Sequence, residues 1–351
     1  MNMKQGIIWE LLADYWICLC LEMSLTKNNR IRLFYNKKRR MKTIKNIFSK
    51  KVAIVITIVL LLCSCSKDSN PDPSNPDPSN PEEDIFYLPV VIHIIHNGKP
   101  VGEGTNLSTA RIERQIEILN EDFRRKKGTR GYNNHPDGGD TRIEFVLAKQ
   151  DPDGKPFNGI NRVDSTKVLV PSLGHNVNHY AQYAYWDPKK YINVWTTPLP
   201  EDSECFVFGS ATGPETDLPG TEFFSLPQPG DAEGILINWL HFGESDIACY
   251  ARFGRTLTHE MGHYLGVLHI WGEGDCENND YCDDTPAVDK PVYNIAFIGC
   301  EGEPAMINNY MTWSYDETMN MFTNDQIARM HYVLEHHEGR HALLSSHALK
   351  P

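Results

Sequence analysis

Apolar positions recur with a regular period from residue 85 onward, and they predict strands mixed with long helices. A β-branched run over 86–95 predicts a buried strand, and apolar side chains along one face predict a helix over 108–124. Further strands are expected at residues 143–148, 191–195 and 234–239. Later helices are expected over 257–265 and from Thr323, where Thr323 and Gln326 form a capping-box pattern. This order of elements predicts an α/β domain built on a twisted mixed sheet.

The segment before this domain carries a targeting signal. Basic residues between Lys42 and Lys51 precede an 11-residue apolar run at 52–62. This combination is typical of a signal peptide, which we place at 41–64, and the run is too short to span a bilayer comfortably. Because Met41 opens the signal so naturally, residues 1–40 are expected to be a mis-assigned upstream extension, with a small structured domain as the alternative.

The signal ends in Leu62-Cys63-Ser64-Cys65, which resembles a bacterial lipobox. Cys65 follows a small residue and is the expected lipidated cysteine. Cys63 is the second choice because Leu62 is bulky, and an ordinary signal-peptidase site nearby is the alternative. A lipid anchor holds a protein on a membrane without a spanning helix. We therefore expect an exported outer-membrane or cell-surface lipoprotein of a Gram-negative bacterium.

A proline-rich linker follows the expected anchor. Residues 65–84 contain two copies of Asn-Pro-Asp-Pro-Ser and no large apolar side chain, so they cannot build a core and favour an extended, semi-rigid stalk. The folded domain is expected to cover 85–345, with 346–351 as a tail.

The charge of the chain is unevenly distributed. Residues 1–51 carry 12 basic and 3 acidic side chains, whereas the remaining 300 residues carry 22 basic and 43 acidic ones, a balance of −21. Such a surface disfavours nucleic acid and anionic headgroups as partners, so contact with a membrane is expected only through the lipid. It would attract basic peptides, although an acidic surface usually serves only solubility.

The strongest chemical signal is the pattern H-E-x-x-H-x-x-G-x-x-H. His259 and His263 are spaced to share one helix face and bind the same zinc ion, and Glu260 is placed to reach a water on the metal. Gly266 permits a left-handed turn that ends the helix and delivers His269 as third ligand. The alternatives are chance histidines on a solvent-facing helix or a structural zinc. A structural zinc usually takes four protein ligands and would not need Glu260.

The same motif marks the metzincins, which also carry a methionine turn beneath the zinc. The segment Asn309-Tyr310-Met311-Thr312-Trp313 fits this Met-turn, and its methionine, Met311, lies 42 residues after His269. The chain resembles the pappalysin family of metzincins in these motifs. It also resembles the family in further stretches between residues 85 and 340, namely Leu88–His93, Leu119–Phe123, Tyr185–Pro188 and Met319–Thr323.

The resemblance implies a metzincin-type zincin catalytic domain. Its upper part would hold the sheet and the active-site helix, its lower part would be irregular and contain the Met-turn, and the cleft would lie between them. It also implies an endopeptidase that acts on proteins or peptides, often with calcium near the site. The chain is expected to work as a monomer.

Two residues that follow the turn methionine, Trp313 and Asp316, bear on how the substrate is bound and cleaved. Pappalysins usually have a tyrosine two residues after this methionine that assists the tetrahedral intermediate, but Trp313 stands here, so its indole or Tyr315 must serve or the assistance is missing. Asp316 holds the position that in family members cutting beside basic residues lies at the floor of the pocket for the first residue after the cut. The resemblance therefore implies a preference for Arg, then Lys, with a solvated turn aspartate as the alternative.

Five cysteines follow Cys65, and an exported protein would oxidise most of them. The resemblance favours a disulfide between Cys276 and Cys300, and Cys205 with Cys249 is a weaker candidate. Residues 273–284 are rich in Asp and Glu, whose oxygens suit calcium, although such runs are usually just solvated.

The predicted function is zinc-dependent hydrolysis of peptide bonds by a zinc-bound water, with Glu260 as general base. The rival is a catalytically inactive surface lipoprotein that uses the cleft for binding. Trp313 is the one feature that favours this rival, and the intact Glu260 argues against it.

Overall fold

The computed structural model describes residues 85–350 except 174, 198–208, 248, 273, 278 and 296. The predicted signal peptide, Cys65 and linker lie outside the described residues. The strands are β1 (Phe86–His96), β2 (Ile143–Leu147), β3 (Ile160–Asp164), β4 (Ile192–Thr197), β5 (Gly209–Ala211) and β6 (Ile235–Asn238). The α-helices are α3 (Thr109–Phe123), α4 (Val177–Ala181), α5 (Arg255–Tyr264), α6 (Asn324–His336) and α7 (Glu338–Leu343).

All strands and helices expected from the pattern are present with ends within a few residues, including the Thr323–Gln326 capping box of α6. The pattern missed β3, β5, α4 and α7. Each of these four elements carries at most two large apolar side chains, too few for an apolar period to show.

The sheet is mixed, as expected. Its order is β2-β1-β4-β6-β5, and β3 pairs with the second half of β1. The neighbouring strands are parallel except for β5, which runs antiparallel to β6 at the end of this order. The strand β5 therefore forms one edge of the sheet among the described residues.

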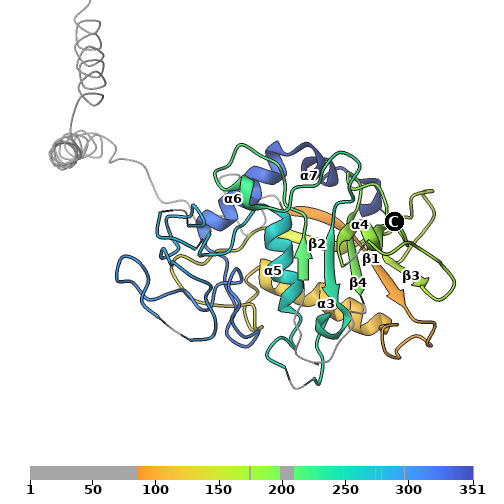
Figure 1. Cartoon of the computed structure of the whole chain (residues 1–351), viewed down its shortest axis with the longest axis horizontal. Helices are drawn as coiled ribbons and strands as arrows, with labels where there is room; N and C mark the ends of the chain where they lie inside the picture. The colour runs from red at the N-terminus through yellow and green to blue at the C-terminus, as the bar shows by residue number, and fades with distance from the viewer. Residues whose placement is uncertain are drawn as a thin grey trace, which may run out of the picture. The chain divides into compact units, whose positions relative to one another are not determined.

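Strand β1 is buried on both faces, as its continuous apolar run predicts. Alternate residues from Leu88 to Ile94 join one core with the apolar faces of α3, α5 and α6, which Figure 1 shows in gold, teal and blue. Val91 points to the other face and packs with Tyr191 and Ala348 in a smaller cluster. The helix α5 is thereby held in place by its packing on the sheet.

Within the expected tail at 346–351, the described residues 346–350 pack against the folded domain, which corrects that part of the expectation. Ala348 is buried in the short 3₁₀-helix His347–Leu349, its carbonyl accepts a hydrogen bond from the Lys149 N–H at 2.8 Å, and Ser346 Oγ donates to the Lys190 carbonyl at 2.7 Å. Three residues give no periodic signal, so the sequence pattern could not show this contact.

Between α5 and α6 the described residues form no helix or regular strand, and this stretch holds the Met-turn. The division into a regular upper part and an irregular lower part therefore agrees with the prediction. No helix among the described residues is long and apolar enough to cross a membrane.

Candidate metal centre and substrate cleft

Glycines bound the helix that carries the zinc motif. Gly254 (φ +79°) precedes α5 and Gly266 (φ +86°) follows it, both in the left-handed region that glycine adopts without strain. After Gly266, the N–H of Val267 donates to the carbonyl of Gly262 at 2.9 Å and turns the chain back. The predicted left-handed turn is therefore present, and it brings His269 to the two histidines of the helix.

The three motif histidines converge on one point. Their Nε2 atoms are 3.2 Å apart between His259 and His263, and 3.1 Å from each of these to His269. Within the described part of the chain, these three form the group of His, Cys, Asp or Glu side chains whose ligand atoms lie close enough to hold one metal ion.

Hydrogen bonds to Nδ1 of His259 and of His263 determine which ring nitrogen of each histidine carries the proton. Nδ1 of His259 donates to the carbonyl of Tyr310 at 2.7 Å, and Nδ1 of His263 donates to the carbonyl of Val267 at 2.8 Å. Because a carbonyl oxygen only accepts, the ring proton sits on Nδ1 and the Nε2 lone pair faces the centre. Burial lowers the pKa of His259 to about 4 and that of His263 to about 3, so both rings are neutral at pH 7.

These donors fit zinc. A tetrahedral ion with Zn–N distances of about 2.0–2.1 Å separates its ligand nitrogens by about 3.3 Å, close to the spacing found here. Three neutral imidazoles that converge on one point, two of them oriented by carbonyls behind the rings, are the donor set of a catalytic zinc site, which keeps its fourth position open.

Glu260 lies next to the histidines without joining their ligand group. Its side chain is 7% exposed, and burial raises its pKa to about 8. A zinc ion held by the three histidines would oppose this shift and favour the carboxylate, the form that accepts a proton.

The predicted Met-turn packs directly beneath α5. Met311 is fully buried, its N–H donates to Asn309 Oδ1 at 2.8 Å, and its carbonyl accepts from the Ile270 N–H at 3.2 Å. A Cβ added to Gly262 would lie 2.5 Å from Met311 Sδ, so the glycine lets the turn approach the helix. The helix and the turn thus hold each other in place around the histidines.

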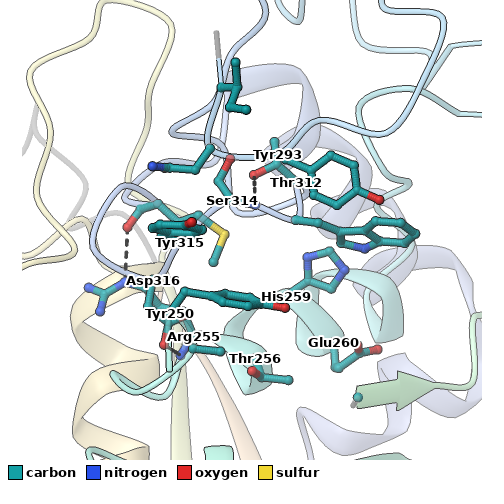
Figure 2. Close-up of a pocket in the computed structure, with 16 residues that line it drawn as sticks. Tyr250, Arg255, Thr256, His259, Glu260, Tyr293, Thr312, Ser314, Tyr315 and Asp316 are labelled. Carbon is teal, nitrogen blue, oxygen red and sulfur yellow. Dashed lines mark hydrogen bonds between the residues drawn. The ribbon is translucent and has the colours of Figure 1, made fainter. Parts of the chain in front are cut away.

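A cavity of about 540 Å³ opens beside His259 and Glu260 (Figure 2). This volume is in the range of pockets that bind small molecules or side chains. Its wall combines aromatic side chains with a carboxylate, and the residues that carry these groups are Tyr250, Tyr293, Trp313, Tyr315 and Asp316.

The chain matches known proteins over this region. A family model described as pregnancy-associated plasma protein-A, the pappalysin family, matches residues 175–335. An extracellular metalloprotease of Colletotrichum graminicola is 37% identical over 248 residues, which cover 70% of this chain and 74% of that protein. The chain belongs to the pappalysin family of metalloproteases. A second relative, an extracellular metalloprotease of Arthroderma benhamiae, is 36% identical over 109 residues. This match covers 28% of this chain and 35% of that protein.

Solved pappalysin structures have the same fold. Mature mirolysin of Tannerella forsythia in complex with a cleaved peptide superimposes with a TM-score of 0.58 at 30% identity, over 74% of this chain and 95% of that chain. Promirolysin of the same organism gives a TM-score of 0.61, also at 30% identity, over 76% and 86% of the two chains. The predictions of a metzincin-type fold and of the pappalysin family are confirmed.

Asp316 lines the cavity, and it also supports the helix α5. It is 2% exposed, and its Oδ2 accepts from the N–H groups of Phe253 at 2.7 Å and Arg255 at 3.3 Å, at the start of α5. Burial raises the pKa of Asp316 to about 6, and these hydrogen bonds oppose the shift.

Trp313 and Tyr315 both line the cavity, and both are about half exposed, at 44% and 45%. Trp313 packs edge-on against His269 and Trp271, with ring centroids 5.5 and 5.0 Å apart. Tyr315 stacks on Tyr250 at 5.2 Å. The cavity therefore offers more phenol groups than sequence reasoning identified, because Tyr250 and Tyr293 carry no motif that marks them.

The cysteines follow the expected arrangement as far as they are described. Cys276 and Cys300 form a disulfide, Cys249 is disulfide-bonded, and Cys282 is a buried free thiol. Cys205, the predicted partner of Cys249, lies outside the described residues.

Sequence reasoning also missed a buried ion pair that links the helices behind the site. Arg255 at the start of α5 pairs with Asp122 of α3 at 3.1 Å, and both side chains are almost fully buried. Asp122 also accepts from Thr258 Oγ1 at 2.8 Å, one residue before His259. The contact joins two different helices, and the apolar pattern of either helix alone does not predict it.

Proposed function

We propose that the protein is a zinc metalloendopeptidase that cleaves proteins or peptides, with Glu260 as general base. The observation that carries the proposal is the triangle of Nε2 atoms from His259, His263 and His269 beside a buried glutamate that lines the cavity. The relative named mirolysin has been captured with a cleaved peptide, which supports the same substrate class.

The three histidines would hold the zinc ion, which when bound supplies Lewis acidity that polarises a carbonyl and acidifies water. Glu260 accepts a proton at its carboxylate when water attacks the scissile carbonyl, and it returns that proton to the leaving amine. The protein contributes buried, oriented groups: the carbonyls of Tyr310 and Val267 hold two of the imidazoles, and the sheet holds the helix.

Digestion of a peptide library by the purified protein tests this function. We expect cleavage within peptide chains, located by mass spectrometry, and its loss when a chelator removes the metal. A library left intact by protein with bound zinc would instead favour the inactive binding protein.

We further propose that Asp316 selects a basic residue immediately after the cut. A carboxylate among the aromatic side chains that line the cavity suits arginine, whose aliphatic stem packs on rings and whose guanidinium can form two charge-assisted hydrogen bonds. Lysine offers a point charge and would be cleaved more slowly.

Asp316→Asn should lower the preference for arginine over an uncharged residue by about 10–100-fold, the worth of a hydrogen bond to a charged group. Asparagine keeps an oxygen that accepts from the Phe253 N–H, so the thermal midpoint should change little. Asp316→Ala is the companion variant, and it should also lose about 1–3 kcal/mol of unfolding free energy by leaving that donor unpaired. Cleavage-site profiling in which Asp316→Asn keeps the arginine preference would refute the assignment.

We propose calcium binding by the acidic stretch at 273–284, with Asp280 and Asp284 as ligands. Each has a buried carboxylate oxygen, Oδ2 and Oδ1 respectively, without a hydrogen-bond partner, an arrangement that a hard cation would satisfy. Burial raises the pKa of Asp280 to about 7.

Calcium at 100 times its dissociation constant should add about 2.7 kcal/mol to the unfolding free energy. Thermal unfolding with calcium or with a calcium chelator measures this, in zinc-loaded protein. Asp280→Asn should abolish the effect, and Asp283→Asn, at an exposed position in the same stretch, should retain it. Equal calcium responses of the two variants would exclude Asp280 as a ligand.

We propose that the protein is exported and anchored through Cys65, and that it acts as a monomer without nucleic-acid partners. The names of the fungal relatives, extracellular metalloproteases, support export. The anchor itself rests on the lipobox pattern of the sequence.

Cys65→Ala should move the protein from the membrane fraction to the soluble fraction, because lipid is the proposed attachment. Cys63→Ala is the control and should remain in the membrane fraction. Detergent-phase partitioning and mass spectrometry of the N-terminus measure both. If Cys65→Ala partitioned like the wild type, the anchor would lie elsewhere.

A further inference from the structure

We infer that Gly209 is a positioning residue that holds the Glu260 carboxylate in its working place, an inference that rests on the proposed role of Glu260 as base. Gly209 is the first residue of the edge strand β5, and it lines the same cavity as Glu260. Figure 2 shows the Glu260 side chain at the side of the cavity away from Asp316.

The contact between the two residues is close. A Cβ added to Gly209 would lie 2.5 Å from Glu260 Oε1, 2.6 Å from Cγ and 2.8 Å from Cδ. Real Cβ atoms are not found at such distances from other atoms, so any side chain at 209 must displace the end of the glutamate. The end of the Glu260 side chain therefore occupies the space that a side chain at position 209 would need.

Backbone conformation does not explain the glycine. Gly209 does not have a left-handed φ, in contrast to Gly254 and Gly266 at the ends of α5. Its partner in the ladder is Ile237 of β6, in a regular antiparallel register that other residues adopt equally well. Alanine at 209 would thus act on Glu260 by steric displacement and would not strain the strand.

The strand also restricts how Glu260 moves. Three atoms of its side chain would touch a Cβ at 209, so the backbone of β5 lies against the length of the side chain and leaves few rotamers open to it. A base held in one orientation loses little entropy when it takes the proton. A shift of about 1 Å in such a group costs up to about 100-fold in rate.

Gly209→Ala should lower kcat by about 10–100-fold with little change in KM, one zinc bound per chain and an unchanged thermal midpoint. Gly139→Ala is the matched control: its added Cβ would lie 2.6 Å from Ile327 Cδ1 and 2.7 Å from Asn324 Oδ1, equally crowded but away from the cleft. The control should lower the thermal midpoint and keep kcat.

A double mutant separates positioning from other effects. Glu260→Ala removes Cγ, Cδ and Oε1, the atoms that the added Cβ would meet, so adding Gly209→Ala to Glu260→Ala should lower the residual kcat much less than the loss of about 10–100-fold expected in the wild type. Equal fold-losses in both backgrounds, wild-type kcat in Gly209→Ala, or a loss of activity that follows a loss of zinc would each overturn the inference. If the wild type itself cleaved no peptide, the proposed function would fail instead, and the two failures are thereby distinguished.

Discussion

Glu260→Gln is expected to lower kcat for peptide hydrolysis by at least about 100-fold and up to about 10⁴-fold, because it removes the proposed general base. Glutamine has nearly the same shape, so it fits the space beside β5 and leaves the three histidines unchanged. The variant should therefore bind one zinc ion per chain and unfold at the wild-type temperature. Steady-state kinetics together with metal analysis of the same sample measures these properties.

Glu117→Gln is a suitable control, because that glutamate is exposed on α3 and remote from the cavity. It should have wild-type activity. Wild-type rates in Glu260→Gln would show that another group takes the proton, and the proposed mechanism would be wrong.

His263→Ala is expected to lose the metal together with the activity. Substituting a group that supports a metal ligand lowers metal affinity by about 10–100-fold. Removing one of the three ligands themselves should lower the affinity further. Dialysed protein should then contain far less than one zinc ion per chain by elemental analysis. His336→Ala, at an exposed histidine of α6, is the control and should retain the zinc. Stoichiometric zinc in dialysed His263→Ala would remove this residue from the ligand set.

These two variants separate the roles that the motif combines. Glu260→Gln should keep zinc and lose activity, whereas His263→Ala should lose both. A structural zinc site would give a different result, since Glu260 would then have no effect on either property.

Local sequence patterns were sufficient for the parts of the site that lie close together in the chain. The spacing of His259, His263 and His269 and the turn at Gly266 depend on one helix and one glycine, so the sequence predicts their convergence. The strand β1 was equally clear, because a strand buried on both faces is a continuous apolar run.

The remaining parts depend on contacts between distant segments. Gly209 and Gly262 matter because Glu260 and Met311 approach them, and nothing in a single sequence marks a glycine that provides space. The ion pair of Asp122 with Arg255 joins residues 133 positions apart. Asp316 was identified through the family resemblance, but its hydrogen bonds to the start of α5 appear only in three dimensions.

The central claim is that a zinc ion on three histidines, with Glu260 beside it, hydrolyses peptide bonds. Titrating zinc into metal-free protein while following the cleavage of one internally quenched peptide tests it most directly. We expect activity to rise linearly and to stop rising at one zinc ion per chain, with Glu260→Gln binding the same zinc and remaining inactive. Full activity in the metal-free protein, or no cleavage at one bound zinc per chain of any peptide that the library contains, would contradict the claim.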